Sequence, residues 1–290
     1  MSTVATRFVN VGGIRTHYLE AGDGPVLVLF HSGEFGASAE LTWEHNIPAL
    51  AERFRVIAPD WLGFGETDKL YDFISGAERR MRHLVAFLEV MDVKRADFAG
   101  ASMGGTALVR EAASERCRLP IRRMVLSSGG GYVPDNEWRR RLLGYDGTVE
   151  AMREILRANF HSPAWAEDDE YVQRRVRASL APGAWEVINA ARLKAPNVSP
   201  RSTFGQPDET PYENVKAPTL IFAGAEDKLR EPGYHAVMAE RIPNARAVVL
   251  ENAGHLLNIE KAEEFNRVTI EFLSGTDHVA AVEATTTVGG

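Results

Sequence analysis

Hydrophobic and polar positions alternate between two patterns along the first half of this chain. One pattern is a short continuous apolar run, typical of a parallel strand that is covered on both faces. Such runs lie at residues 26–30 and 56–58, and residues 95–99 and 121–127 are predicted to be two further strands. The other pattern repeats apolar side chains at helical spacing, as in Met81, Leu84, Val85 and Leu88. It predicts helices at residues 41–54, 74–91 and 103–115, and their alternation with the strands predicts an α/β fold with a mostly parallel, doubly wound sheet.

The second half of the chain contains a predicted helical insertion. From residue 134 to residue 212, helical stretches are broken by prolines, namely Pro163, Pro182, Pro196, Pro200, Pro207 and Pro211. Strand patterns resume at residues 219–223 and 247–250, and an amphipathic helix is predicted at 262–273. We therefore expect a core of residues 1–133 and 213–275, a helical cap of residues 134–212 inserted after the sixth strand, and a flexible tail of residues 276–290.

Composition and charge restrict the function classes. The 290 residues are 44% hydrophobic, which is enough for a substantial core. The net charge of −7 and the lack of a basic tract argue against nucleic-acid binding, which depends on clustered Lys and Arg. Neither a signal peptide nor a membrane-spanning apolar run is recognisable, so we expect a cytoplasmic protein without membrane contact. The single cysteine, Cys117, fits a reducing compartment.

The segment most informative about function is the G-x-S-x-G sequence from Gly100 to Gly104, with Ser102 at its centre. It follows a predicted strand and opens a predicted helix, which is the setting of a nucleophile elbow. In such a turn the serine hydroxyl projects above the sheet, and the flanking glycines allow strand and helix to pass closely. A structural turn without catalytic function is the alternative, because the pattern alone also occurs by chance.

A serine hydroxyl needs a neighbouring imidazole to accept its proton, and the imidazole needs a carboxylate to orient it. The chain offers Asp227 and His255, each in the turn or loop after a later strand, in the order that α/β-hydrolases use. Glu226 is a weaker candidate for the acid, because it would point elsewhere from the same turn. His31 is expected to form structural hydrogen bonds rather than to act as a second base. We therefore predict that Ser102, Asp227 and His255 are catalytic.

Acyl transfer also requires N–H donors aimed at the oxyanion that develops on the substrate. The backbone N–H of Met103 directly follows the nucleophile, and Gly33 lies in the loop after the third strand, so these two are the predicted donors. Aromatic side chains of the cap are candidates for lining the pocket, namely Trp138, Phe160, Trp165 and Trp185, although packing within the cap is the commoner role of such residues. This chemistry needs no cofactor, and neither a metal-spaced His or Cys cluster nor a phosphate loop is recognisable.

Together these motifs resemble the serine-type α/β-hydrolases over residues 24–273. The resemblance implies the α/β-hydrolase fold, and the nucleophilic serine separates the chain from epoxide hydrolases and haloalkane dehalogenases, which carry aspartate at the elbow. Residues 38–60 and 264–267 further resemble the meta-cleavage-product hydrolases, which cleave a C–C bond in ring-opened aromatic catabolites.

The second resemblance also implies substrate-binding positions. Arg175 falls where that family keeps an arginine for the dienolate and carboxylate of the substrate, although a solvated helix face is the alternative interpretation. At four other positions the chain departs from the family. It has Ser32 instead of glycine, Thr42 and Ala101 instead of asparagine, and Leu256 instead of tryptophan. These departures imply a substrate that is less polar around the scissile carbonyl.

Three functions remain open at this stage, and a small molecule is the expected partner in each. The first is a serine hydrolase that cleaves a C–C bond next to a carbonyl in a ring-opened aromatic compound, a vinylogous diketone. The second is a carboxylesterase or lactonase acting on an apolar ester. The third is a non-catalytic ligand receptor on the same fold. Self-association into a homo-oligomer is also left open.

Overall fold

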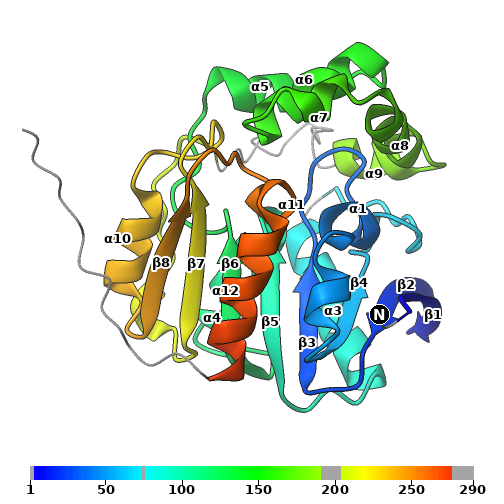
Figure 1. Cartoon of the computed structure of the whole chain (residues 1–290). Helices are drawn as coiled ribbons and strands as arrows, with labels where there is room; N and C mark the ends of the chain where they lie inside the picture. Colours follow the sequence, from blue (N-terminus) through cyan, green and yellow to red (C-terminus); the bar gives the residue numbers. More distant parts are fainter. Residues whose placement is uncertain (1–2, 74–75, 191–203, 276–290) are drawn as a thin grey trace, which may run out of the picture.

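The computed structural model describes residues 3–73, 76–190 and 204–275. In this part of the chain an eight-stranded sheet has the strand order β1-β2-β4-β3-β5-β6-β7-β8 (Figure 1). Strand β2 is antiparallel to both of its neighbours, whereas all pairs from β4 to β8 are parallel. The strands are β1 (Ala5–Val11), β2 (Ile14–Ala21), β3 (Val26–Phe30), β4 (Arg55–Pro59), β5 (Ala96–Ala101), β6 (Ile121–Ser127), β7 (Thr219–Gly224) and β8 (Ala245–Leu250).

Helices cover both faces of the sheet, because successive strand residues alternate between two hydrophobic clusters. On β3, Val28 and Phe30 belong to one cluster, and Leu27 and Leu29 to the other. The first cluster includes side chains of α3 (Gly76–Val90), α4 (Met103–Ala112), α10 (Tyr234–Arg241) and the 3₁₀ helix η1 (Tyr212–Asn214). The second includes side chains of α1 (Ala39–Trp43), α2 (Ile47–Leu50), α11 (Leu257–Glu260) and α12 (Ala262–Ser274). The doubly wound α/β prediction is therefore confirmed.

The cap helices follow β6 and precede β7, as predicted for an insertion after the sixth strand, and they gather above the sheet in Figure 1. They are α5 (Glu137–Leu143), α6 (Val149–Asn159), α7 (Ala164–Glu167), α8 (Asp169–Ser179) and α9 (Ala184–Ala190). A third hydrophobic cluster joins them to Phe35, Leu256 and Ile259 of the core. The division into core and cap domains stays a prediction, and residues 191–203 and the predicted tail 276–290 lie outside the described residues.

One predicted helix is wrong in extent. Residues 41–54 were expected to form one helix, but the structure has the two short helices α1 and α2. Pro48 lies in the first turn of α2, where its missing N–H is tolerated, whereas inside a continuous helix it would break the hydrogen-bond ladder. Asn46 lies between the two helices and is fully buried, and its amide donates to Asn258 O and Asn266 Oδ1.

The other predicted elements agree with the structure to within a few residues at their ends. Strands β1 and β2 have no residue range among the predictions. Most side chains of the edge strand β1 are exposed, and β2 is mostly buried but contains polar residues such as Thr16 and His17, so neither gives a continuous apolar run. Across the described residues, no helix is long and apolar enough to cross a membrane.

Candidate active site

Ser102 occupies a sharp turn between β5 and α4, with φ 50° and ψ −109°. This conformation is uncommon for a residue that carries a Cβ atom. The flanking glycines allow the backbones to approach. A Cβ on Gly100 would lie 2.6 Å from the carbonyl carbon of Gly104, and a Cβ on Gly104 would lie 2.4 Å from the Phe30 carbonyl oxygen. The start of α4 therefore packs directly against β5 and the end of β3.

Two later loops bring an imidazole and a carboxylate to this turn. His255 follows β8 and its Nε2 lies 2.7 Å from Ser102 Oγ, while its Nδ1 lies 2.8 Å from Asp227 Oδ2. Asp227 follows β7, and its other oxygen accepts the Leu229 N–H at 2.8 Å. The carboxyl ends of neighbouring parallel strands meet at one edge of the sheet, so residues 153 positions apart in the chain become hydrogen-bonded.

The surroundings keep Asp227 ionised. Burial alone raises the pKa of this carboxyl group, but the charges of His255 and Arg230 and the hydrogen bonds from His255 and Leu229 lower the pKa below its usual range. An ionised Asp227 accepts a hydrogen bond from the N–H at His255 Nδ1, which leaves Nε2 as the acceptor facing the serine hydroxyl. Glu226 points elsewhere, because its carboxylate accepts the Ala253 N–H at 2.8 Å.

The two predicted oxyanion donors lie beside the serine. Met103 is the first residue of α4, so its N–H has no acceptor within the helix. Gly33 contacts it closely, since a Cβ on Gly33 would lie 2.6 Å from Met103 Sδ. Both residues line the same cavity as Ser102 and His255. The arrangement can therefore present backbone N–H groups to a carbonyl oxygen held at Ser102.

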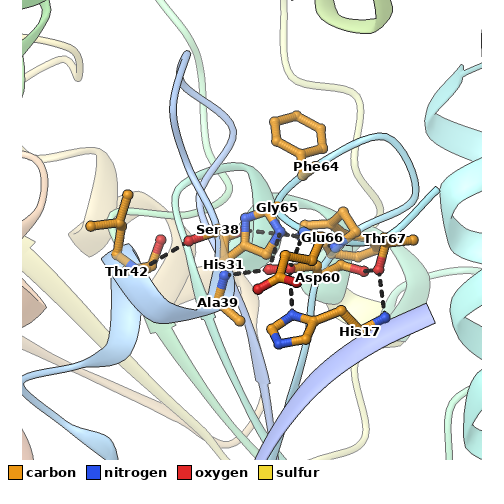
Figure 2. A network of polar contacts seen from close by, with 12 residues as sticks. His17, His31, Ser38, Ala39, Thr42, Asp60, Phe64, Gly65, Glu66 and Thr67 are labelled. Atoms are coloured by element: carbon orange, nitrogen blue, oxygen red, sulfur yellow. Dashed lines mark hydrogen bonds and ion pairs between the residues drawn. The ribbon is translucent and has the colours of Figure 1, made fainter. Parts of the chain in front are cut away.

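A buried network around Asp60 supports the loop that carries Gly33 (Figure 2). Asp60 Oδ2 accepts from His17 Nδ1 at 2.6 Å and from the Glu66 N–H at 2.8 Å. Its Oδ1 accepts the Ala39 N–H, at the start of α1, at 2.7 Å. This carboxylate therefore ties β2, the turn after β4 and the first residue of α1 to one another.

His31 lies within the same network and has both ring nitrogens engaged. Its Nδ1 lies 2.6 Å from the Ser32 carbonyl oxygen, and its Nε2 accepts the Trp61 N–H at 2.9 Å. Burial lowers the pKa of His31, although Asp60 opposes this shift. A neutral imidazole with Nδ1 protonated satisfies both contacts, which agrees with the predicted structural role.

A cavity of about 610 Å³ opens between the elbow and the cap. On the core side it is lined by Gly33, Ser102, Met103 and His255, and on the cap side by Leu142, Leu143 and Ile188. Its size suits a small organic molecule. Because the reacting hydroxyl opens into a largely apolar space, the site is shaped for a substrate with an apolar portion.

The comparisons with known proteins decide the family. The profile of the "Alpha/beta hydrolase family" matches residues 27–268. The chain belongs to this family. It is 32% identical to the 2-hydroxy-6-oxo-6-(2'-aminophenyl)hexa-2,4-dienoic acid hydrolase of Metapseudomonas resinovorans, with 94% of this chain and 92% of that protein covered. It is 31% identical to the 2-hydroxymuconate semialdehyde hydrolase of Pseudomonas sp. strain CF600, with 94% and 95% covered.

Solved structures agree. The meta-cleavage product hydrolase from Pseudomonas fluorescens IP01, in a mutant form, superposes with a TM-score of 0.82 and 28% identity over 93% of this chain and 98% of that one. The protein is thus an α/β-fold serine hydrolase of the meta-cleavage product hydrolase group.

Arg175 of this hydrolase is fully buried and already paired. Its Nη1 donates to Glu34 Oε1 at 2.6 Å, and its Nη2 donates to the Tyr171 hydroxyl at 2.7 Å. Burial alone raises the pKa of Glu34, but Arg175 and the Ser32 hydroxyl lower it below its usual range. Glu34 and Arg175 therefore form an internal ion pair, and a substrate carboxylate could reach Arg175 only by displacing Glu34.

The other predicted substrate-binding residues surround this pair or pack beneath the cavity. The Ser32 hydroxyl donates to Glu34 and lies 3.0 Å from Thr42 Oγ1. Ala101 and Leu256 are buried in hydrophobic clusters. None of these residues, nor Arg175, belongs to the lining of the 610 Å³ cavity, so their contact with substrate stays a prediction.

The aromatic cap residues also lie away from the cavity. Phe160 stacks on Trp165 with ring centroids 4.8 Å apart, inside the cap. Lys228 and Arg141 lie over the ring of Trp138, and the Trp185 indole N–H donates to the Tyr145 carbonyl oxygen. None of these four candidates belongs to the lining of the cavity, which agrees with the alternative that they pack elsewhere, and aliphatic side chains of α5 and α9 line the cavity instead.

Two residues that sequence reasoning missed anchor the cap to the catalytic loops. Glu260 accepts the Gly254 N–H at 2.8 Å and also the N–H groups of His161 and Ser162, just after α6. Lys228, next to Asp227, donates to the Arg157 carbonyl oxygen at 2.8 Å. These contacts join segments about 70 to 100 positions apart, and a single sequence carries no local signal for them.

Proposed function

We propose that this hydrolase cleaves a C–C bond next to a carbonyl group in a ring-opened aromatic compound, a vinylogous diketone. The observation that carries the proposal is the hydrogen-bonded series of Ser102, His255 and Asp227 at the wall of the cavity. The name of the Metapseudomonas resinovorans relative, which matches over most of both chains, supports the substrate class.

In the proposed reaction His255 Nε2 accepts the hydroxyl proton while Ser102 Oγ bonds to the substrate carbonyl carbon. The Gly33 and Met103 N–H groups stabilise the resulting oxyanion. When the C–C bond breaks, the conjugated carbonyl of the leaving fragment delocalises the electron pair, and His255 returns the proton to carbon. A water molecule, deprotonated by His255, then hydrolyses the acyl-serine, while Asp227 stabilises the charged imidazole.

A carboxylesterase or lactonase acting on an apolar ester is the second candidate. It is favoured by the Glu34–Arg175 ion pair, which leaves that arginine without free charge for a dienoate. The apolar Ala101 and Leu256, at positions where the resemblance expected asparagine and tryptophan, point the same way. The acyl chemistry at Ser102 would be the same in both cases.

The test compares kcat/KM for a meta-cleavage dienolate, followed by loss of its visible absorbance, with kcat/KM for a short aryl ester. We expect the dienolate to be preferred and Ser102→Ala to lower turnover by roughly 10⁴- to 10⁶-fold while the fold, checked by circular dichroism, is retained. Ester turnover with an inert dienolate would support the second candidate. Ligand binding without turnover of either compound would instead favour a receptor.

A further inference from the structure

We propose that the cavity contains a carboxylate-binding subsite formed by Arg139 and Arg230, separate from Arg175. This subsite is argued from the two arginines, and it rests on the proposed function only for which substrate carries the carboxylate. Arg139 lies on α5, and Arg230 follows β7, whereas Glu34 and Arg175 lie after β3 and on α8. Strands β3 and β7 are on opposite sides of β5, which leads to Ser102. The two arginines therefore flank the nucleophile on the side away from the internal ion pair.

Arg230 is buried, but its hydrogen bonds go to neutral acceptors. Nε and Nη2 donate to the Ser128 carbonyl oxygen at 3.0 and 2.6 Å, and Nη1 donates to the Gly130 carbonyl oxygen at 2.7 Å. The side chain is 6% exposed and lines the cavity. Carbonyl groups fix the orientation of a guanidinium, but they do not neutralise its charge. Asp227, the acidic neighbour that interacts with this charge, is already hydrogen-bonded to His255.

Arg139 adds a second positive charge next to the first. Its Nη2 donates to the Leu229 carbonyl oxygen at 2.8 Å, which places it beside the residue that precedes Arg230. Its buried Nε has no hydrogen-bond partner. Burial first, and then the charge of Arg230, lower the pKa of Arg139 to about 10, although the charge of Asp227 opposes this shift. Among the described residues, neither arginine forms an ion pair with a carboxylate, and the ionised Asp227, which interacts with both, offsets one of the two positive charges.

The other cations at this cavity are balanced or solvated. Arg118 pairs with Glu78 and Glu111, each at 2.7 Å, and Arg110 is exposed on α4. Among the described cations that line this cavity, Arg230 is buried, and the half-buried Arg139 beside it has a buried N–H donor without a partner. A bound carboxylate would satisfy that donor and offset the repulsion between the guanidinium groups.

The apolar side chains next to Arg139 and Arg230 indicate which carbon skeleton carries the bound carboxylate. Leu142, Leu143 and Leu229 line the same cavity, and the Phe204 ring lies 5.0 Å from the Arg139 guanidinium carbon. These side chains fit an aromatic or unsaturated carbon skeleton. The structure therefore assigns to this subsite a substrate or product with a carboxylate on such a skeleton, directed toward α5.

The test measures binding of benzoate and of benzamide, its uncharged analogue of similar shape, to the full chain by isothermal titration calorimetry. We expect benzoate to bind more tightly than benzamide. Arg139→Gln should weaken benzoate binding by about 10- to 100-fold and leave benzamide unaffected, because one charge-assisted hydrogen bond is lost. Arg139→Lys keeps the charge and should bind benzoate more tightly than Arg139→Gln does.

Arg140→Gln is the matched control. Arg140 lies on the same helix, but its side chain is 66% exposed and pairs with Asp135, so benzoate affinity should stay unchanged. No benzoate binding, equal affinities for benzoate and benzamide, or the same loss in both glutamine variants would overturn the subsite. If benzoate binding depends on Arg139 but neither the dienolate nor the ester is cleaved, the proposed function fails and the subsite stands. Thermal unfolding of each variant reports on its fold.

Discussion

At the scale of single residues, the conformation of Ser102 links stability to function. Its φ of 50° and ψ of −109° are costly for a residue with a Cβ atom, by about 1 to 3 kcal/mol. Parallel strand β6 holds the backbone in place, because the Ser102 N–H donates to the Ser127 carbonyl oxygen at 2.8 Å. The surrounding sheet therefore maintains a strained turn that exposes the hydroxyl to His255.

We predict that the free energy of unfolding of the Ser102→Gly variant is about 1 kcal/mol higher than that of the Ser102→Ala variant. Glycine adopts positive φ without steric cost, and this gain exceeds its larger loss of conformational freedom on folding. Urea-induced unfolding measures the difference. The control is Ala113→Gly, at a φ of −84°, where glycine should lower stability instead. Equal stabilities of the two Ser102 variants would show that the turn stores no strain.

The hydrogen-bonded residues Ser102, His255 and Asp227 could be predicted because each follows a recognisable strand. The order of the parallel strands then places all three at one edge of the sheet. The burial of Arg175 and its ion pair with Glu34 could not be predicted. Its charge is neutralised by Glu34, 141 positions away, and only the tertiary fold brings them together. Glu34 was visible beside Gly33 in the predicted oxyanion loop, but a charged side chain in a loop is more often solvated than buried.

At the scale of elements, the prediction succeeded where one pattern corresponds to one element and failed where a buried polar contact intervenes. Strand β3 matches its predicted range because a continuous apolar run identifies a strand buried on both faces. The break between α1 and α2 involves Pro48, in the first turn of α2, and the buried Asn46, whose partners Asn258 and Asn266 lie on α11 and α12. Such contacts leave no periodic trace in the sequence.

At the scale of elements, we predict how replacing Asp60 affects stability. Asp60→Asn should lower the free energy of unfolding by about 3 kcal/mol, because an amide NH₂ would replace an oxygen that accepts buried N–H groups. The affected donors are His17 Nδ1 and the Glu66 and Ala39 N–H groups (Figure 2). Thermal or urea unfolding measures the loss.

A surface aspartate provides the matched control for this change. Asp92 is 81% exposed and pairs with Lys94, so Asp92→Asn should change stability by less than about 0.5 kcal/mol. If Asp60→Asn were as mild as this control, the network in Figure 2 would not hold β2, β4 and α1 together.

At the scale of the whole molecule, buried titratable groups determine how stability depends on pH. The pKa values of Glu34, Asp60 and Asp227 lie below their usual range, since hydrogen bonds and positive charges outweigh the effect of burial. Burial lowers the pKa of His31. In all four cases the unfolded chain binds protons more readily than the native protein, so acid favours unfolding.

We therefore predict two stages of destabilisation as the pH falls. Below about pH 6.5, His31 is protonated in the unfolded chain but neutral in the native protein, and stability begins to fall. The contribution of the three carboxylates is fully present above their unfolded pKa values of 4.5 and 3.8 and is lost as the pH falls through the native ones. At pH 3.5 the three carboxylates should make stability fall by about 3 kcal/mol per pH unit, since the unfolded chain binds about two protons on them and each adds about 1.4 kcal/mol.

Urea unfolding between pH 8 and pH 3.5 measures how the free energy of unfolding depends on pH. The Asp60→Asn variant isolates the contribution of the Asp60 carboxylate to this dependence. The variant starts from a lower stability, but it lacks one titrating carboxylate. Below about pH 4 its stability should therefore fall less steeply than that of the natural sequence, by up to about 0.9 kcal/mol per pH unit at pH 3.5, where an unfolded aspartate of pKa 3.8 is about two-thirds protonated. Parallel curves would mean that Asp60 binds its proton equally well in the folded and unfolded chain. The network around Asp60 would then contribute to stability through packing rather than through the charge of its carboxylate.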